Sequence, residues 1–238
     1  ASIGKKNMEG QYCFLRVNWP QQEKCLGHRV GEAVELGLTN GKKEKVWRYY
    51  IPLSRLDEQG GADFMIKMIE GEFSSLLKES AVGQKLSIRG PSTGWVYKGF
   101  GNIEYLGGVK HNQPPRQGTF DTLVMIAHDT GITAFFNLLD TIADFKEDKT
   151  KLSLVYVVDS IEDLALPDEL LSLQEECRVA VQVVLNEQPK GIQEKDNLAE
   201  SLEEAIPLHN NKTAFLVCGK RSFVAEVNEI LEKIPRVE

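Results

Sequence analysis

The amino-acid sequence predicts two domains of different class, an all-β antiparallel barrel followed by an α/β doubly wound parallel sheet. The length of 238 residues suits one large domain or two small ones. Short alternating segments fill the first half, whereas apolar runs alternate with amphipathic segments in the second half. The charge balance changes from +4 over residues 1–110 (16 Lys and Arg, 12 Asp and Glu) to −11 over residues 111–238 (12 and 23). These observations indicate a boundary near the middle of the chain.

The first domain, expected over residues 1–110, consists of short strands and one helix. Residues 12–17 alternate apolar and polar side chains, as a half-buried strand does. Residues 71–78 have the spacing of a short helix. Many short strands separated by glycine and proline turns indicate a small antiparallel barrel. The predicted strands cover residues 12–17, 34–38, 46–51, 63–69, 85–88, 95–97 and 102–106.

The second domain is expected over residues 121–238, after a polar, proline-containing linker at residues 111–120. Four strand–helix repeats predict a parallel sheet covered on both faces, which binds ligands at the carboxyl ends of its strands. The predicted strands cover residues 122–127, 152–158, 179–185 and 214–218. The predicted helices cover residues 132–145, 167–176, 198–205 and 223–234. The loops of interest are therefore 127–133, 158–163, 185–190 and 218–223.

Composition excludes several classes of protein. No apolar run approaches the ~18 residues of a membrane span, and we expect no secretory leader. The four cysteines lack C-x-x-C spacing, so we predict no metal site and no disulfide framework, and a reducing intracellular compartment. The acidic second half argues against nucleic-acid binding, which depends on cations that neutralise phosphates.

Four segments resemble, in order, the motifs of one enzyme family. Residues 47–54 (W-R-Y-Y-I-P-L-S) are similar to the flavin motif R-P-Y-T-P-x-S, and residues 89–101 are similar to R-G-P-x-G followed by V-Y-x-G-x-G. Residues 125–133 (M-I-A-H-D-T-G-I-T) resemble M-I-A-G-G-T-G-I-T-P, and residues 215–219 (F-L-V-C-G) resemble the strand that ends in C-G-P-P. From about residue 12 to 234 the chain thus resembles the NADH–cytochrome b5 reductases of the ferredoxin reductase superfamily. We expect the first barrel strand of that family to be missing.

The resemblance implies that the barrel binds FAD rather than FMN. Arg48 would bridge the pyrophosphate, because a guanidinium offers a fork of donors to phosphate oxygens. Tyr50 would lie against the flavin ring, and the helix start at residues 71–74 would offer backbone N–H groups to an anion. The alternative is that Arg48 is a surface cation stacked on an aromatic ring. The matched motif positions are Arg48, Tyr50, Pro52, Ser54, Gly71, Phe73 and Ser74.

The resemblance also implies a site for NADH or NADPH in the second domain. There Thr130, Gly131, Thr133 and Gly219 match the family's cofactor-binding positions. Lys67 and Cys218 match positions near the nicotinamide and the hydride-transfer position, which makes them the candidate catalytic residues. Cys218 could be a nucleophile, but a cysteine at the end of a buried strand is more often a small core residue.

Several positions depart from the family pattern. Ile51 replaces a hydroxyl residue and offers the flavin neither donor nor acceptor, and Glu72 brings a negative charge to the helix start. His128 and Asp129 replace two glycines whose small size lets the chain approach a dinucleotide. Asn186 stands where the family has an NADH-preferring aspartate. We therefore expect NADH and NADPH to bind weakly and turnover to be impaired. Lys220 and Arg221, which replace the two prolines, could offset part of this by binding phosphate.

Three hypotheses remain open at this stage. The first is an FAD-dependent NAD(P)H oxidoreductase of cytochrome b5 reductase type that passes electrons to a heme-protein acceptor. The second is a retired reductase, a pseudoenzyme that serves as a structural subunit of a larger assembly. The third is a nucleotide-binding regulatory module without redox chemistry. We expect the protein in the mitochondrion or the cytosol, with any membrane association made through a partner.

Overall fold

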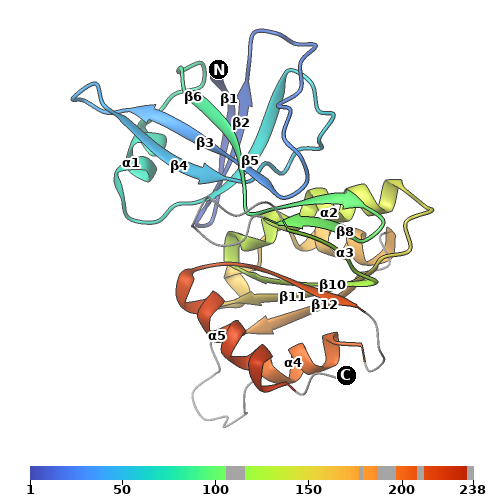
Figure 1. Cartoon of the computed structure of the whole chain (residues 1–238). Coiled ribbons are helices and arrows are strands. Elements are labelled where there is room, and N and C mark those ends of the chain that lie inside the picture. Colours follow the sequence, from blue (N-terminus) through green and yellow to red (C-terminus); the bar gives the residue numbers. More distant parts are fainter. Residues whose placement is uncertain (106–115, 177–178, 187–196, 208–211, 235–238) are drawn as a thin grey trace, which may run out of the picture. The chain divides into compact units, whose positions relative to one another are not determined.

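The computed structural model describes residues 1–105, 116–176, 179–186, 197–207 and 212–234, and Figure 1 shows their arrangement. The chain divides into two compact units. Unit 1 contains Ala1–Tyr97, Tyr105–Arg116 and Phe136–Leu138, and unit 2 contains Lys98–Glu104, Gln117–Phe135 and Leu139–Glu238. Most of the predicted linker, together with Cys177 and part of the predicted 185–190 loop, lies outside the described residues.

Unit 1 contains two three-stranded antiparallel sheets, in the orders β1-β2-β5 and β4-β3-β6. Alternate residues of β2, among them Cys13, Leu15 and Val17, are fully buried, which agrees with the period-2 pattern of its sequence. These side chains share a core with Phe64 and with Phe73. The strands are β1 (Ser2–Glu9), β2 (Tyr12–Asn18), β3 (Glu32–Thr39), β4 (Lys45–Tyr50), β5 (Gly61–Lys67) and β6 (Ser87–Thr93).

One short helix, α1 (Glu72–Glu79), packs against β3 and β4. Its buried residues Phe73 and Leu77 are four positions apart, so they lie on the same face of the helix. The contact between the helix and β4 includes the rings of Phe73 and Tyr50, whose centroids are 5.5 Å apart. The predicted helix at residues 71–78 is thus present, and it places the segment before it next to β4.

Two features of unit 1 correct the sequence analysis. The first barrel strand is present as β1, which pairs with β2. Its sequence pattern is weak because only Ile3 is buried and the one other large apolar residue of the strand, Met8, is exposed. Strand β6 does not end at residue 88 but continues to Thr93 through Gly90 and Pro91. Proline is tolerated there because β6 lies at the edge of its sheet.

A third antiparallel sheet has the order β7-β8-β9, formed by Trp95–Gly99, Asn102–Tyr105 and Arg116–Thr119. Strand β9 lies within the predicted linker of residues 111–120, so the end of that segment is not a linker. Its four residues, R-Q-G-T, are exposed or half-buried and therefore carry no hydrophobic alternation that would predict a strand.

Unit 2 is built on a four-stranded parallel sheet of order β12-β11-β10-β13. Every residue of β10 is buried, as a central strand covered on both faces requires. Helices α4 and α5 cover one face, and α2 and α3 lie on the other (Figure 1). The strands are β10 (Thr122–His128), β11 (Lys151–Val158), β12 (Val179–Leu185) and β13 (Thr213–Cys218). The helices are α2 (Thr133–Asp144), α3 (Pro167–Glu176), α4 (Asn197–Ala205) and α5 (Arg221–Lys233).

The strand order creates a topological switch point between β10 and β13. Strands β11 and β12 follow β10 on one side, whereas β13 pairs with β10 on the other side. Parallel sheets bind ligands in the crevice at the carboxyl ends of the strands where the order reverses. The fold therefore directs attention to the segments that follow His128 and Cys218. Among the described helices, none is both long and apolar enough to cross a membrane.

Candidate functional site

The loops that follow β10 and β13 meet backbone to backbone. A Cβ atom added at Gly131 would lie 2.2 Å from the carbonyl oxygen of Cys218. A Cβ atom at Gly219 would lie 2.8 Å from Cδ1 of Phe223 and 2.9 Å from the Cβ atom of His128. Only glycine fits both positions without movement of the neighbouring chain. The structure thus brings together two of the predicted cofactor residues, Gly131 and Gly219, with the candidate catalytic residue Cys218.

The segment Asp129–Ile132 forms a single 3₁₀ turn that leads directly into α2. The hydroxyl of Thr133 donates a hydrogen bond to the carbonyl of Thr130 at 2.9 Å, which closes this turn. Asp129 has a φ of +55°, in the left-handed region that favours glycine. A side chain other than hydrogen is therefore strained at the position where the resemblance expects glycine, although Asp tolerates this region better than most residues.

The sequence analysis expects the side chain of His128 to occupy space needed by a dinucleotide, but the structure places it elsewhere. Its side chain turns into the protein, and the residue is only 4% exposed. The Nε2 atom lies 3.2 Å from Oδ1 of Asp159 at the end of β11, and the ring packs against Phe223 of α5 with centroids 5.0 Å apart. The physical reason is that burial against Phe223 and a hydrogen bond to Asp159 satisfy both the apolar and the polar parts of the ring.

Asp159 was not singled out from the sequence, although the loop that contains it was. Asn186, the residue after β12, donates a hydrogen bond from Nδ2 to the same Oδ1 atom at 3.0 Å. Hydrogen bonds from Asn186 and His128, together with the charge of Lys220, lower the pKa of the Asp159 carboxyl. Its position in the sequence could have identified it, because Asp159 is the first polar residue after the apolar run of β11.

Cys218 is the last residue of β13 and is half-buried beside the switch point. Burial raises the pKa of its thiol to about 11. The thiol therefore stays protonated near neutral pH, and this cysteine is not suited to act as a thiolate nucleophile. Lys67, the other candidate catalytic residue, ends β5 in unit 1, where its Nζ atom lies 5.9 Å from the ring centroid of Tyr12.

The predicted flavin-binding residues of unit 1 gather at β4 and the start of α1. Arg48 is exposed, and its Nη1 donates to the carbonyl of Trp47 at 2.8 Å. Tyr50 is half-buried against Phe73, and burial raises the pKa of its hydroxyl, so the hydroxyl remains a proton donor. Two other cations lie over the ring of Trp47, namely Arg89, with Cζ 4.1 Å from the ring centroid, and Lys45, with Nζ 5.9 Å from it. Among the described residues of this strand region, the stacking that the alternative expects of Arg48 is thus made by Arg89 and Lys45.

The other residues of the flavin motif have different surroundings. Pro52 is buried, and Ile51 is half-buried and presents no polar group. The hydroxyl oxygen of Ser54 accepts a hydrogen bond from the backbone N–H of Asp63 at 3.2 Å, so it supports the chain after β4. Phe73 belongs to the core and packs against the ring of Tyr50. Ser74 is half-buried in the first turn of α1.

The N-terminus of α1 fits an anionic group. A Cβ atom at Gly71 would meet no atom within 4 Å, so the space beside this helix start is open. No side chain caps the helix at Gly71, which leaves the first backbone N–H groups to an anion or solvent. Glu72, whose charge opposes an anion, accepts a hydrogen bond from Nδ2 of Asn40 at 2.8 Å, and so its carboxylate is held toward the turn after β3. With Arg48 nearby on β4, these groups suit a pyrophosphate.

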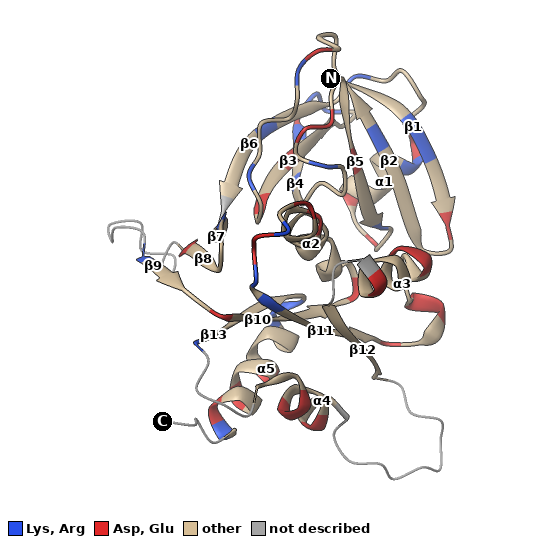
Figure 2. Ribbon diagram, turned by 90° about the vertical axis from the view of Figure 1, so that its right-hand side faces the viewer, with Lys and Arg blue, Asp and Glu red and all other residues tan. Residues whose placement is uncertain are grey.

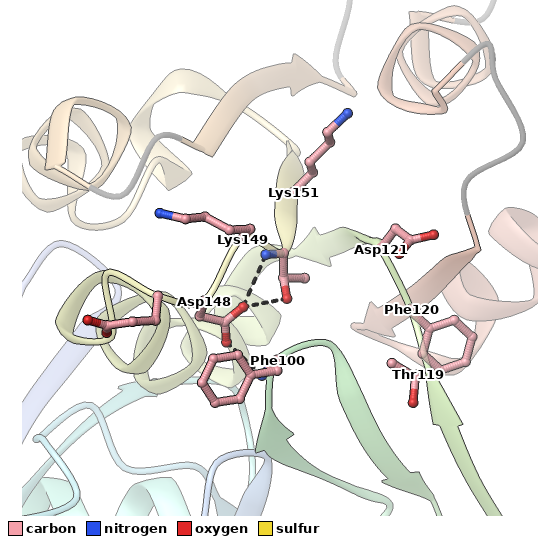
Figure 3. Close-up of a pocket in the computed structure, with 9 residues that line it drawn as sticks. Phe100, Thr119, Phe120, Asp121, Asp148, Lys149 and Lys151 are labelled. Atoms are coloured by element: carbon pink, nitrogen blue, oxygen red, sulfur yellow. Dashed lines mark hydrogen bonds between the residues drawn. The ribbon is translucent and has the colours of Figure 1, made fainter.

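A separate pocket of about 440 Å³ lies at the opposite, amino-terminal edge of the parallel sheet (Figure 3). Its walls include Phe100 and the segment between α2 and β11. The carboxylate of Asp148 accepts hydrogen bonds from the backbone N–H of Phe100 at 2.8 Å and from the hydroxyl of Thr150 at 2.6 Å. Asp148 therefore serves the local structure, and the pocket lies away from the strand ends at which parallel sheets bind nucleotides.

Comparisons with known proteins agree with this geometry. Residues 3–97 match the family model of the oxidoreductase FAD-binding domain, and residues 125–229 match that of the oxidoreductase NAD-binding domain. NADH-cytochrome b5 reductase 1 of Debaryomyces hansenii is 30% identical over 232 residues, which cover 95% of this chain and 75% of that protein. The protein of the same name from Dictyostelium discoideum is 30% identical over 87% of this chain and 67% of its own length.

Solved structures show the same fold. The cytochrome b5 reductase domain of Ulva prolifera nitrate reductase has a TM-score of 0.84 at 20% identity, covering 100% of this chain and 93% of that chain. The CS-b5R domains of human Ncb5or, solved in the NAD⁺ form, have a TM-score of 0.77 at 18% identity, covering 100% of this chain and 66% of that chain. At these identities the likeness concerns the fold alone.

The protonated state of Cys218 can be tested by alkylation. We expect iodoacetamide to modify Cys218 slowly at pH 7.5, because a thiol pKa of about 11 leaves roughly 300-fold less thiolate than a free cysteine has. The rate should rise with pH up to about 11. Peptide mapping by mass spectrometry measures each cysteine separately, and exposed Cys25 is the internal control. Equal rates for both cysteines at pH 7.5 would contradict the assignment.

Proposed function

Because the chain belongs to the NADH–cytochrome b5 reductase family, we propose that it is an FAD-dependent oxidoreductase that oxidises NADH or NADPH and reduces a heme protein. The observation that carries this function is the match of both halves of the chain, residues 3–97 to an FAD-binding domain and residues 125–229 to an NAD-binding domain. One polypeptide thus contains a domain for the hydride donor, NADH or NADPH, and a domain for the hydride acceptor, FAD. FAD, when bound, accepts a hydride and releases electrons one at a time.

The residues of unit 1 would hold FAD from its phosphates and from its ring. Arg48 offers a charged fork of donors, and the open helix start at Gly71 offers backbone N–H groups, so both attract a pyrophosphate. Tyr50, fixed in place by Phe73, presents a flat apolar ring with a hydroxyl donor. Ile51 contributes only apolar contact, so this chain does not polarise the flavin ring through the side chain at that position.

The residues of unit 2 would hold the nicotinamide nucleotide at the switch point. The turn Asp129–Ile132 and the loop at Gly219 place backbone groups at the carboxyl ends of β10 and β13. Cys218, neutral near pH 7 because of burial, can pack against an apolar ring without repelling it. Lys220 and Arg221 follow directly and supply positive charge for phosphate groups.

The retired-enzyme alternative has lost one of its three arguments. It rested on Ile51, His128 and Asp129, but His128 is buried against Phe223 rather than lying in the approach of a dinucleotide. Ile51 and Asp129 still argue for slow turnover. No observation favours a purely structural subunit or a regulatory module over the reductase.

For the acceptor, we propose a heme protein, as the name of the relatives suggests, and we infer from the charge of this chain that the surface of the acceptor is acidic. Lysine and arginine outnumber acidic residues over residues 1–110, and Figure 2 shows basic residues on strands β1 and β2 and acidic residues on α3 and α4. Opposite charges accelerate encounter between proteins. A reducing compartment, in the mitochondrion or the cytosol, remains part of the proposal.

FAD binding is the first test. The protein purified or reconstituted with FAD should be yellow, and heating should release FAD rather than FMN. We expect Arg48→Ala to weaken FAD binding about ten- to a hundredfold, because one charge-assisted hydrogen bond contributes roughly 1.5–3 kcal/mol. Titration followed by flavin fluorescence measures the Kd, and Lys42→Ala, an exposed cation in the turn after β3, is the control. A protein that stays colourless with excess FAD would refute the proposal.

The cost of Asp129 can be measured by flavin reduction. Two like charges ~4–5 Å apart at an effective dielectric constant of ~20 repel by roughly 3–4 kcal/mol, so Asp129→Gly should tighten NADH binding by up to a few hundredfold. Glycine also suits the φ of +55° at this position. Stopped-flow bleaching of the bound flavin against NADH concentration gives the affinity. His128→Gly is the comparison, and it should not tighten binding because it only removes contacts with Asp159 and Phe223. An unchanged NADH affinity in Asp129→Gly would place the carboxylate away from the pyrophosphate.

Steering by charge predicts a dependence on salt. The rate constant of reduction of an acidic cytochrome b5 should fall several-fold between low and physiological ionic strength, since screening weakens long-range attraction. The flavin-reduction rate with NADH, measured in the same buffers, corrects for effects on the first half-reaction. Second-order rates that do not change with salt would exclude steering.

A further inference from the structure

Asp159 lies where the sheet topology places the adenosine half of a dinucleotide. Strand β11 is the second strand of the parallel sheet in chain order and the neighbour of β10 on the side away from β13. In doubly wound sheets an acidic residue near the end of the second strand binds the 2′-hydroxyl of the adenosine ribose, and its charge disfavours the 2′-phosphate of NADP. Asp159 follows the last residue of β11 directly. The chain thus has a carboxylate at this position, whereas the neighbouring strand β12 is followed by the neutral Asn186.

The carboxylate of Asp159 is held on one side and open on the other. His128 Nε2 and Asn186 Nδ2 both contact Oδ1, at 3.2 Å and 3.0 Å. Within the described part of the chain, Oδ2 has no hydrogen-bond partner, and the side chain is 37% exposed. One oxygen is therefore fixed by the protein, while the other remains available as an acceptor in a side chain that is partly exposed. Such an arrangement suits a ribose hydroxyl, which donates to Oδ2 without breaking the existing contacts.

The two neighbours determine the direction of the carboxylate. Asn186 is anchored by its own backbone N–H, which donates to the carbonyl of Val158 at 2.8 Å and so extends the β11–β12 pairing by one residue. His128 is anchored by its burial and by Phe223. Both contacts join residues at the ends of different strands, His128 on β10 and Asn186 after β12. The side chain of Asp159 is therefore preorganised between two rigid supports.

From this geometry we propose that Asp159 is the residue that selects NADH over NADPH, with His128 and Asn186 as its positioning residues. The proposal rests on the proposed oxidoreductase function and deepens it, because it names the nucleotide. His128 stands where the family pattern has glycine. In this chain its side chain then has a function of its own, because it orients the carboxylate of Asp159. The opposite result would follow if Lys220 and Arg221 bound the 2′-phosphate, since Lys220 lies close enough to influence the charge of Asp159.

The test uses binding of nucleotide fragments, which needs no hydride transfer. Titration calorimetry compares 5′-AMP with adenosine 2′,5′-bisphosphate, a pair that differs only in the 2′-phosphate. We expect the wild-type protein to prefer 5′-AMP, and Asp159→Asn to shift the ratio of the two Kd values about ten- to a hundredfold toward the bisphosphate. The asparagine retains an oxygen for His128 and Asn186, so the fold should persist. The control is Glu162→Gln, which removes an exposed charge three residues away in the same loop and should leave the ratio unchanged.

The positioning role has its own comparison. His128→Ala removes the donor to Oδ1 and should lower the preference for 5′-AMP by several-fold, whereas His128→Gln retains a donor and should restore most of it. A merely structural role would lower the affinity for both fragments equally and leave the ratio unchanged.

A second readout separates this proposal from the proposed function. Flavin reduction by NADH and by NADPH gives the ratio of the two kcat/KM values, which should change in the same direction in Asp159→Asn. If neither nucleotide reduces the flavin but the fragment ratio shifts, the oxidoreductase function fails and the selectivity of Asp159 stands. If NADH reduces the flavin and Asp159→Asn leaves both ratios unchanged, or if the wild type prefers the bisphosphate, Asp159 is not the selective residue.

Discussion

The arrangement of unit 2 depends on the close backbone contact between the loops that follow β10 and β13. A side chain at residue 131 would collide with the carbonyl oxygen of Cys218, and one at residue 219 would collide with His128 and Phe223. The two glycines therefore let β10 and β13, the strands on either side of the switch point, end side by side. The 3₁₀ turn at Asp129–Ile132, the start of α2 and the position of Cys218 all depend on this approach. The close approach of the two loops occurs at the carboxyl ends of the strands, where parallel sheets bind ligands.

His128 illustrates how a departure from a family pattern can be accommodated by packing. The imidazole occupies a place beneath the loops, with Phe223 on its apolar side and Asp159 at its polar edge. The ends of β10, β11 and β12 are thereby connected through His128, Asp159 and Asn186. At Asp129, by contrast, the backbone adopts a left-handed conformation that favours glycine. The two adjacent substitutions, which look equivalent in the sequence, therefore have different structural surroundings.

Two arginines of the sheet β4-β3-β6 in unit 1 have different surroundings. Arg89 stacks on Trp47 and pairs with Glu35, so its charge is already used within the sheet. Gly37, opposite Trp47 in the β3–β4 register, leaves room for the indole, because a Cβ atom there would lie 2.7 Å from the ring. Arg48, one residue along from Trp47, keeps an exposed guanidinium. The core beneath, in which Phe73 supports Tyr50, fixes the strand and the helix start that would hold FAD between them.

The sequence by itself determined the two domain classes, the order of nearly all strands and helices, and the family. Local periodicity suffices for these, as in β12 and α3, whose bounds agree with the predicted residues 179–185 and 167–176. Strands β1 and β9 required the structure, because edge strands with few buried residues carry little hydrophobic pattern. For the candidate site, the sequence predicted those positions at which the family motifs keep glycine or arginine, such as Arg48, Gly131 and Gly219. Only the tertiary structure decided that His128 turns inward and that Asp159 receives it, because these partners are 31 residues apart and meet through the pairing of β10 with β11.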